Sequence, residues 1–176
     1  IVVKNIITRI IFKLLNFLLF QVGWFICVLG AANDSTFLAL ALATTLIIIH
    51  ISITPHKIDD IKLFAYALII GFVYDGFIQF YGLILYNSAG WQFPLPPLWI
   101  LMLWVLFSMT LNHSLSWLKG RIIISSVFGF VGGPLAYIAA EKLGAITITS
   151  SQTIFILALG WAIITPTLIF LSGKYD

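Results

Sequence analysis

Long apolar runs separated by short polar segments dominate the chain. The runs are continuous, and each has about the 17–25 residues that a helix needs to cross the hydrocarbon layer. An alternation of apolar and polar positions would have indicated a β-barrel instead. The pattern therefore predicts an all-α integral membrane protein, a compact bundle of six transmembrane helices in a single domain over residues 1–176. The expected spans are residues 10–29, 36–53, 63–86, 98–118, 122–140 and 153–171.

The composition supports this reading. Hydrophobic residues make up 61% of the chain and charged residues 9%, whereas a soluble domain has about 25% charged residues. So few charges cannot cover a surface exposed to water. The net charge of +3 does not indicate nucleic acid, because the basic residues fall between the spans rather than in one patch.

Basic residues also predict the orientation. With the N-terminus inside, the positive-inside rule is satisfied and both termini are cytoplasmic. The inside segments then hold Lys4, Arg9, Lys13, Lys57, Lys62, Lys119, Arg121 and Lys174, and the outside segments hold only Lys142.

The first apolar run has features of a secretory signal peptide, with a basic start and small residues at Gly30–Ala32. Asn16 and Gln21 are unusual in such a peptide, so we expect a true span. The sequence begins with Ile1, and we expect the initiator methionine and a few more residues to precede it.

Asp75 is the most unusual residue of the third span. It is predicted to lie about 18 Å from the start of that span at Leu63, and an acid at that depth costs about 2.5–3.5 kcal/mol on insertion scales. Gly71, Gln79 and Gly82 follow the same helical face as Asp75, so this face is expected to point into the bundle.

No lysine or arginine lies in the core of any predicted span, which leaves three possibilities for Asp75. The acid is protonated and joins helices; or it is held by neutral donors such as Gln79, Gln21, a tyrosine or a tryptophan; or it meets a cation from outside the chain. The functional alternatives are a substrate or proton site and a contact with a partner protein.

The fifth span contains a candidate helix break at Gly132, Gly133 and Pro134. Proline removes a backbone donor, and a broken helix at mid-membrane exposes polar groups that transporters use for binding. The alternative is a kink with small-residue packing, which the spacing of Ser125, Gly129 and Gly133 favours.

Other polar residues suggest where a site would lie. His113 could relay protons, although a hydrogen-bonded histidine near the interface is more common, and the same applies to His50. Asp59 and Asp60 are expected in a solvated loop. The candidate intramembrane polar site consists of Asp75, Gln79, Gln21, Trp24, Asn112 and His113.

No metal or cofactor is expected from the sequence. The single cysteine, Cys27, lies inside an apolar run, and no Cys/His metal spacing is present.

Three stretches together carry a family resemblance. They are NFLLFQVGWFICVLGAA (16–32), LWILMLWVLFSMTLNHSLSWL (98–118) and GGPLAYIAAEKLGA (132–145), with the glycine-flanked aspartate at Asp75 as a further similarity. They resemble a family of small bacterial inner-membrane proteins classed as a domain of unknown function, DUF2878. The resemblance implies a multi-pass protein of the bacterial inner (cytoplasmic) membrane, associated with lipid modification of the cyclopropane-fatty-acid-synthase type. It supplies no catalytic residues.

These observations lead to three hypotheses of function. The first is a protein that binds a lipid or other apolar small molecule, or is the membrane partner of a lipid-modifying system, and is not itself an enzyme. The second is a proton-coupled transporter with Asp75 as carrier and His113 as relay. The third is an intramembrane lipid enzyme that uses one of these two residues for acid–base chemistry. Membrane lipids and lipid-modification proteins are the expected partners, and an oligomer is possible.

Overall fold

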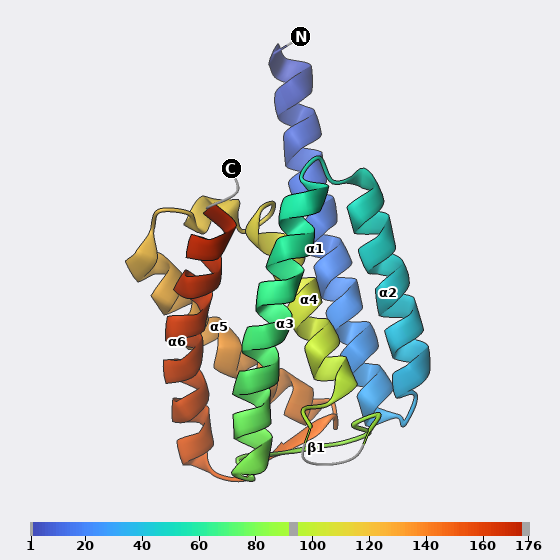
Figure 1. Ribbon diagram of the computed structural model, residues 1–176, viewed down its shortest axis with the longest axis vertical. Helices are drawn as coiled ribbons and strands as arrows, with labels where there is room; N and C mark the ends of the chain where they lie inside the picture. The colour runs from blue at the N-terminus through green and yellow to red at the C-terminus, as the bar shows by residue number, and fades with distance from the viewer. Residues whose placement is uncertain (1, 92–94, 174–176) are drawn as a thin grey trace.

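The computed structural model describes residues 2–91 and 95–173, with side chains from residue 7 onward. These ranges form six α-helices, one turn of 3-10 helix and a two-stranded antiparallel sheet (Figure 1). The helices are α1 (Val2–Ala32), α2 (Thr36–Ile53), α3 (Lys57–Phe80), α4 (Leu98–Leu111), α5 (Ile122–Lys142) and α6 (Ser151–Gly173); the 3-10 turn is η1 (Ser116–Leu118), and the strands are β1 (Ile84–Tyr86) and β2 (Ile146–Ile148).

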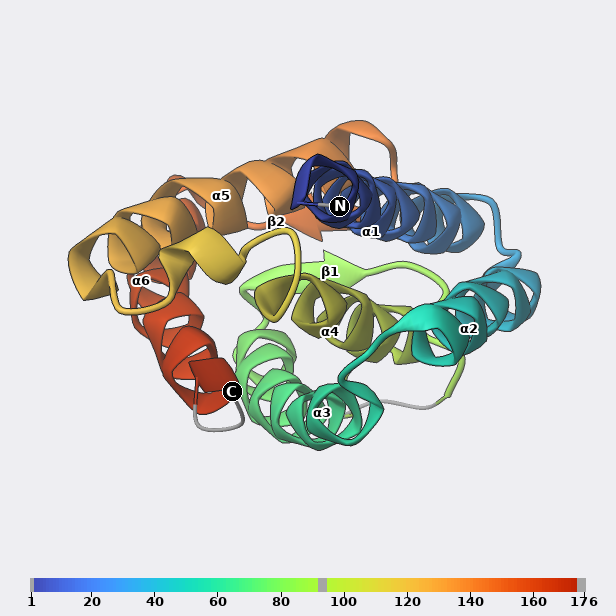
Figure 2. The same cartoon turned by 90° about the horizontal axis from the view of Figure 1, so that it is seen from above.

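Consecutive helices run in alternating directions. The start of α1 and the end of α6 lie at one end of the bundle, called the inner end below, and β1 and β2 close the opposite, outer end (Figure 1). α4 lies in the middle and contacts α1, α2, α3 and α6 (Figure 2). α5 packs chiefly on α6. Lys174, expected on the inside, lies outside the described residues.

Five of the six helices in the described ranges are long and apolar enough to cross a membrane, namely all except α4. The predicted count of six spans is therefore wrong, because the expected span 98–118 is not one helix. α4 has 14 residues, about 21 Å at 1.5 Å per residue, against a hydrocarbon layer of about 30 Å. The helix ends where the polar pair Asn112 and His113 turns toward α3, and residues 116–118 form η1 instead.

Large apolar side chains cover the outside of the bundle, whereas some ionisable side chains of the helices are buried within its mainly apolar core. Large apolar side chains on the outer faces are widely exposed, such as Phe37 at 71% and Ile123 at 80%. Three ionisable side chains, His50, Asp60 and Asp75, are by contrast fully buried. A surface in contact with lipid instead of water requires this distribution.

α3 begins at Lys57 and ends at Phe80, so the predicted span 63–86 is displaced toward the inner end. This places Asp60 inside the helix and not in a solvated loop, whereas the side chain of Asp59 stays partly exposed. Beyond the helix the chain turns at Gly82, whose φ of +63° favours glycine. The predicted stripe on the Asp75 face therefore ends at Gln79 and does not include Gly82.

The outer end is closed by the short sheet. β1 pairs antiparallel with β2, with Tyr86 opposite Ile146. The backbone N–H of Ile148 donates to Oε1 of Glu141 at 2.8 Å, which ties β2 to the end of α5. This arrangement holds Tyr86 over the last two turns of α3, where Asp75 lies.

α5 runs without interruption through Pro134, so the predicted helix break at Gly132, Gly133 and Pro134 is wrong. A Cβ atom at Gly133 would overlap the side chain of Trp161 in α6. Close approach of the two helices therefore stabilises α5 around the proline, and the alternative of small-residue packing is confirmed.

Candidate functional site

Asp75 accepts three hydrogen bonds within the bundle. Its Oδ1 accepts from the hydroxyl groups of Tyr86 and Tyr137, both at 2.7 Å, and its Oδ2 accepts from the indole Nε1 of Trp104 at 2.6 Å. One side chain thus ties α3 to β1, α5 and α4. Of the possibilities left open by the sequence, the structure shows neutral donors, and they are tyrosine and tryptophan instead of Gln79 or Gln21.

Tyr86 is the donor that lies outside the long helices. Its burial and the adjacent carboxylate of Asp75 raise the pKa of its phenol well above the usual range. The phenol therefore keeps its proton and remains a donor to the carboxylate.

A pocket of about 430 Å³ lies beside Asp75, between α1, α4, α5 and α6. Two of the donors to Asp75, Trp104 and Tyr137, form part of its wall. The pocket opens on the side of the bundle, because Phe25 and Leu135, which also line it, are 48% and 58% exposed. It is called the lateral pocket below. Further aromatic lining comes from Phe20, Trp24, Phe107, Phe128 and Trp161.

Asp75 fixes the position of aromatic side chains in the wall of the lateral pocket. Trp104, which donates to that carboxylate, stacks on Trp161 with ring centroids 4.9 Å apart and an interplanar angle of 11°. Phe107 meets the same Trp161 edge-on at 5.4 Å. The buried acid therefore sets the orientation of one indole, and that indole supports the next.

Two polar atoms at the lateral pocket have no hydrogen-bond partner among the described residues. They are Nε1 of Trp161 and Oγ1 of Thr165, both buried. The indole of Trp161 lies near the hydroxyl of Tyr137 but outside direct hydrogen-bonding geometry. A buried polar group without a partner costs about 1–3 kcal/mol. An acceptor atom of a bound molecule would remove this cost at Trp161, whose indole N–H can only donate.

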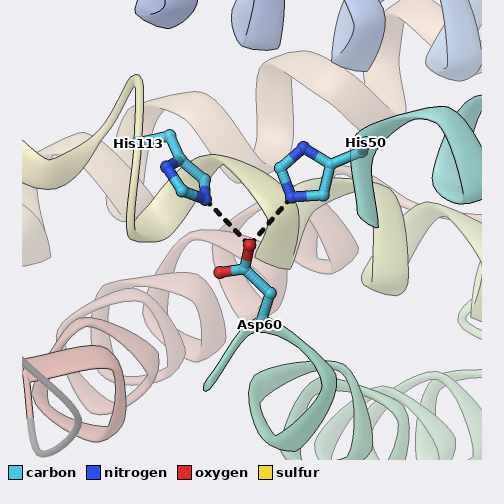
Figure 3. Close-up of side chains that lie close together, drawn as sticks. All are labelled: His50, Asp60 and His113. Atoms are coloured by element: carbon cyan, nitrogen blue, oxygen red, sulfur yellow. Dashed lines mark hydrogen bonds and ion pairs between the residues drawn. The ribbon is translucent and has the colours of Figure 1, made fainter. Parts of the chain in front are cut away.

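A second polar group lies at the inner end and consists of His50, Asp60 and His113, called the inner cluster below (Figure 3). Nε2 of His50 lies 3.0 Å from Oδ2 of Asp60, and Nε2 of His113 lies 2.8 Å from the same oxygen. His50 comes from the last turn of α2 and Asp60 from the start of α3. These are the helix ends at which a base and an acid are each favoured by the helix dipole, and the short α2–α3 connection brings them together.

Neutral side chains surround the inner cluster. Thr54 donates to Oδ2 of Asp60 at 2.8 Å, and Asn112 donates to Oδ1 at 2.9 Å. Asn16 of α1 donates to the carbonyl of Met109 at 3.0 Å, and its Nδ2 lies 3.5 Å from Nδ1 of His50. The cluster and its neighbours thus join the middle of α1 to the inner ends of α2, α3 and α4.

The inner cluster also has the composition of a metal-binding group. One donor atom from each of its three residues lies within 4.8 Å of the other two, and all three residues are buried. Shared hydrogen bonds between the helices and coordination of an ion are both within the chemistry of this set.

The candidate residues from the sequence therefore do not form one site. Gln21 and Trp24 line the lateral pocket. Asp75 lies behind the wall of that pocket. Oε1 of Gln79 has no partner among the described residues. Asn112 and His113 belong with Asp60 at the inner end.

Sequence reasoning missed the partners of both acids. The sequence indicated a tyrosine or a tryptophan as a donor to Asp75 without identifying Tyr86, Tyr137 or Trp104, and it placed Asp60 in a loop. The available signal was the position of His50 and His113 at matching inner ends of two predicted spans, with Asp60 close to the same level.

Comparison with known proteins places residues 13–167 in one family. The model of the family described as "Protein of unknown function (DUF2878)" matches this range, which is most of the chain. No curated protein and no solved structure matches the chain.

Proposed function

Because this chain belongs to DUF2878, a family described only as being of unknown function, its own side chains must carry the argument, and we propose that it binds an apolar small molecule or lipid in the lateral pocket. The protein would be a multi-pass component of the bacterial inner membrane and not itself an enzyme. The ligand would enter from the surrounding lipid through the opening at Phe25 and Leu135.

The single observation that supports this proposal most is the pairing of an apolar pocket with unpartnered polar atoms. The volume of about 430 Å³ falls in the range of about 300–1,000 Å³ that is typical of small-molecule sites. Aromatic walls with one or two orienting polar groups are typical of such sites as well. Trp161 and Thr165 supply those groups.

The position of these polar atoms narrows the class of ligand. Transfer of a hydrocarbon chain from lipid into an apolar pocket brings little hydrophobic gain, because both surroundings are apolar. Selection must then come from the shape of the aromatic walls and from hydrogen bonds. Trp161 and Thr165 lie in the middle part of α6, where an ordinary acyl chain carries no polar atom. The preferred ligand therefore has an oxygen or nitrogen acceptor within its hydrocarbon portion.

This class includes lipids whose chains have been chemically modified. A cyclopropane ring adds only a methylene group and no acceptor atom, so the modified chains in this class are those that carry an oxygen, such as hydroxy, keto or methoxy chains. The geometry gives less support to a proton carrier at Asp75, because this side chain is fully buried and both of its oxygens are bonded to donors.

Mass spectrometry of the protein released from native membrane nanodiscs tests the proposal. The expected result is a co-purifying molecule at a stoichiometry near one per chain, enriched over its abundance in the total lipid extract. A folded protein that carries only bulk phospholipid, in the proportions of the membrane, would contradict it.

A further inference from the structure

We propose that the inner cluster binds one divalent transition-metal ion, of the Zn²⁺ or Fe²⁺ type, through His50, Asp60 and His113. The site is independent of the lateral pocket, and it departs from the sequence-based expectation that the chain has no metal site. Two imidazoles and one carboxylate form a donor set that suits these ions better than Mg²⁺ or Ca²⁺, which favour oxygen ligands.

The distances between donor atoms fit coordination of one ion. Zinc lies about 2.0–2.2 Å from nitrogen and carboxylate oxygen, so two neighbouring ligands are about 3.0–3.5 Å apart. Oδ2 of Asp60 lies 3.0 Å from Nε2 of His50 and 2.8 Å from Nε2 of His113. The two histidine nitrogens lie within 4.8 Å of each other as well, so movements of the three side chains would place one ion between them.

A fourth donor atom, an oxygen, lies next to these three atoms. Oγ1 of Thr54 is 2.8 Å from Oδ2 of Asp60 and 3.2 Å from Nε2 of His113. It could complete a four-coordinate shell or hold a water molecule that does so. Four donor atoms from α2, α3 and the segment after α4 thus converge on one small volume.

The surrounding residues support part of the required geometry. Asn112 donates to Oδ1 of Asp60 at 2.9 Å, which leaves Oδ2 directed at the two histidines. A metal on Nε2 of His50 requires a proton on Nδ1. The nearest polar atom there is Nδ2 of Asn16 at 3.5 Å, so this contact must rearrange when the metal binds.

An entry path is present on the inner side. A hollow of about 680 Å³ is lined by Phe12, His56, Asn112 and His113, and also by the basic side chains of Arg9 and Lys13, whose charges oppose the approach of a cation. His113 lies at the junction of this hollow with the inner cluster, so an ion can reach the ligands without crossing the apolar bundle.

Titration with Co²⁺ tests the site, because this ion reports its own coordination through visible absorption. The protein would carry a Strep-tag in place of a polyhistidine tag, be treated with a chelator and be titrated in detergent. The expected result is one Co²⁺ per chain with absorption of a low-coordinate N/O site, displacement by equimolar Zn²⁺, and a rise in the unfolding temperature on addition of Zn²⁺.

Variants separate this site from surface binding. His113→Gln is expected to weaken Co²⁺ binding at least 100-fold, and Asp59→Asn, which changes a partly exposed acid next to the cluster, to leave it within twofold. If His113→Gln does not fold, the rise in the unfolding temperature of the wild-type protein on addition of Zn²⁺ tests the site instead. Absence of saturable Co²⁺ binding and of a Zn²⁺ shift in the wild type would overturn the proposal, as would equal binding by both variants.

Discussion

The indole Nε1 of Trp104 donates to Oδ2 of Asp75 at 2.6 Å, and the same indole stacks on Trp161 in the wall of the lateral pocket. Asp75 therefore stabilises the pocket wall from the side of Trp104 that faces away from the pocket. It does not face the pocket itself, but it fixes the aromatic surface that a ligand would contact. This relationship links a fully buried acid of α3 to the wall of the lateral pocket.

Replacement of Asp75 by asparagine should destabilise the bundle. Asparagine offers a single acceptor oxygen, while three donors converge on the site, so at least one donor loses its acceptor. The expected loss in the free energy of unfolding is about 1–3 kcal/mol, measured by SDS titration of the purified protein. Asp34→Asn is the matched control, because Asp34 is exposed at a φ of +52° that asparagine tolerates. Equal stability of both variants would show that the three hydrogen bonds contribute nothing.

The architecture could be predicted from the sequence more fully than the sites. Long apolar runs identify five helices that are long and apolar enough to cross a membrane, because a helix satisfies its own backbone in an apolar layer. The run 98–118 misled the count, since α4 is buried in the middle of the bundle and is apolar for that reason and not because it reaches across the membrane. Hydropathy alone does not distinguish these two causes.

The partners of the buried acids could not be predicted because they depend on tertiary contacts. Asp75 and Tyr137 are bonded although 62 positions separate them, and no periodicity along one helix reports such a pair. Asp60 was assigned to a loop because a helix start was placed at the first uninterrupted apolar residue, Leu63. The helix dipole favours an acid at the true start of α3, and hydrogen bonds from four side chains offset the free-energy cost of burying Asp60.

Asp60 should be far more sensitive than its neighbour Asp59. Asp60→Asn replaces an acceptor of four contacts by a group that brings two hydrogens of its own, and hydrogen bonds to charged groups contribute about 1.5–3 kcal/mol each. We expect a loss of at least about 2 kcal/mol in the free energy of unfolding, with chelator present to remove any metal. Asp59→Asn removes an exposed ion pair with Lys62 at 3.6 Å, and such pairs contribute about 0–1 kcal/mol. Similar losses in both variants would contradict the buried role of Asp60.

Neighbouring glycines of α5 should respond in opposite ways to alanine. A methyl group at Gly133 would overlap Trp161, whereas at Gly132 the nearest atom would be Cε1 of Phe128 at 4.0 Å. Gly133→Ala is therefore expected to lower the unfolding temperature. Gly132→Ala should raise it slightly, since alanine is favoured over glycine in a helix by about 0.5–1 kcal/mol. Thermal unfolding in detergent compares the two, and a stable Gly133→Ala protein would show that α5 and α6 are not in close contact there.

Filling the lateral pocket at Gly132 should remove its ligand without unfolding the protein. Gly132 lines the pocket and has space for a side chain, so the leucine of Gly132→Leu would occupy the volume that we assign to the bound molecule. The matched control is Gly173→Leu, which places the same side chain in open space at the end of α6. Both changes exchange glycine for a better helix former, so neither is expected to lower stability.

Native mass spectrometry of the two variants then separates occupancy from stability. The co-purifying molecule should fall at least tenfold in Gly132→Leu and remain at the wild-type level in Gly173→Leu, with unfolding temperatures at or above that of the wild type. Retention of the molecule by a folded Gly132→Leu protein would place the binding site elsewhere. Loss from both variants would mean that the molecule is held by the general surface of the helices, where Gly132 has no special role.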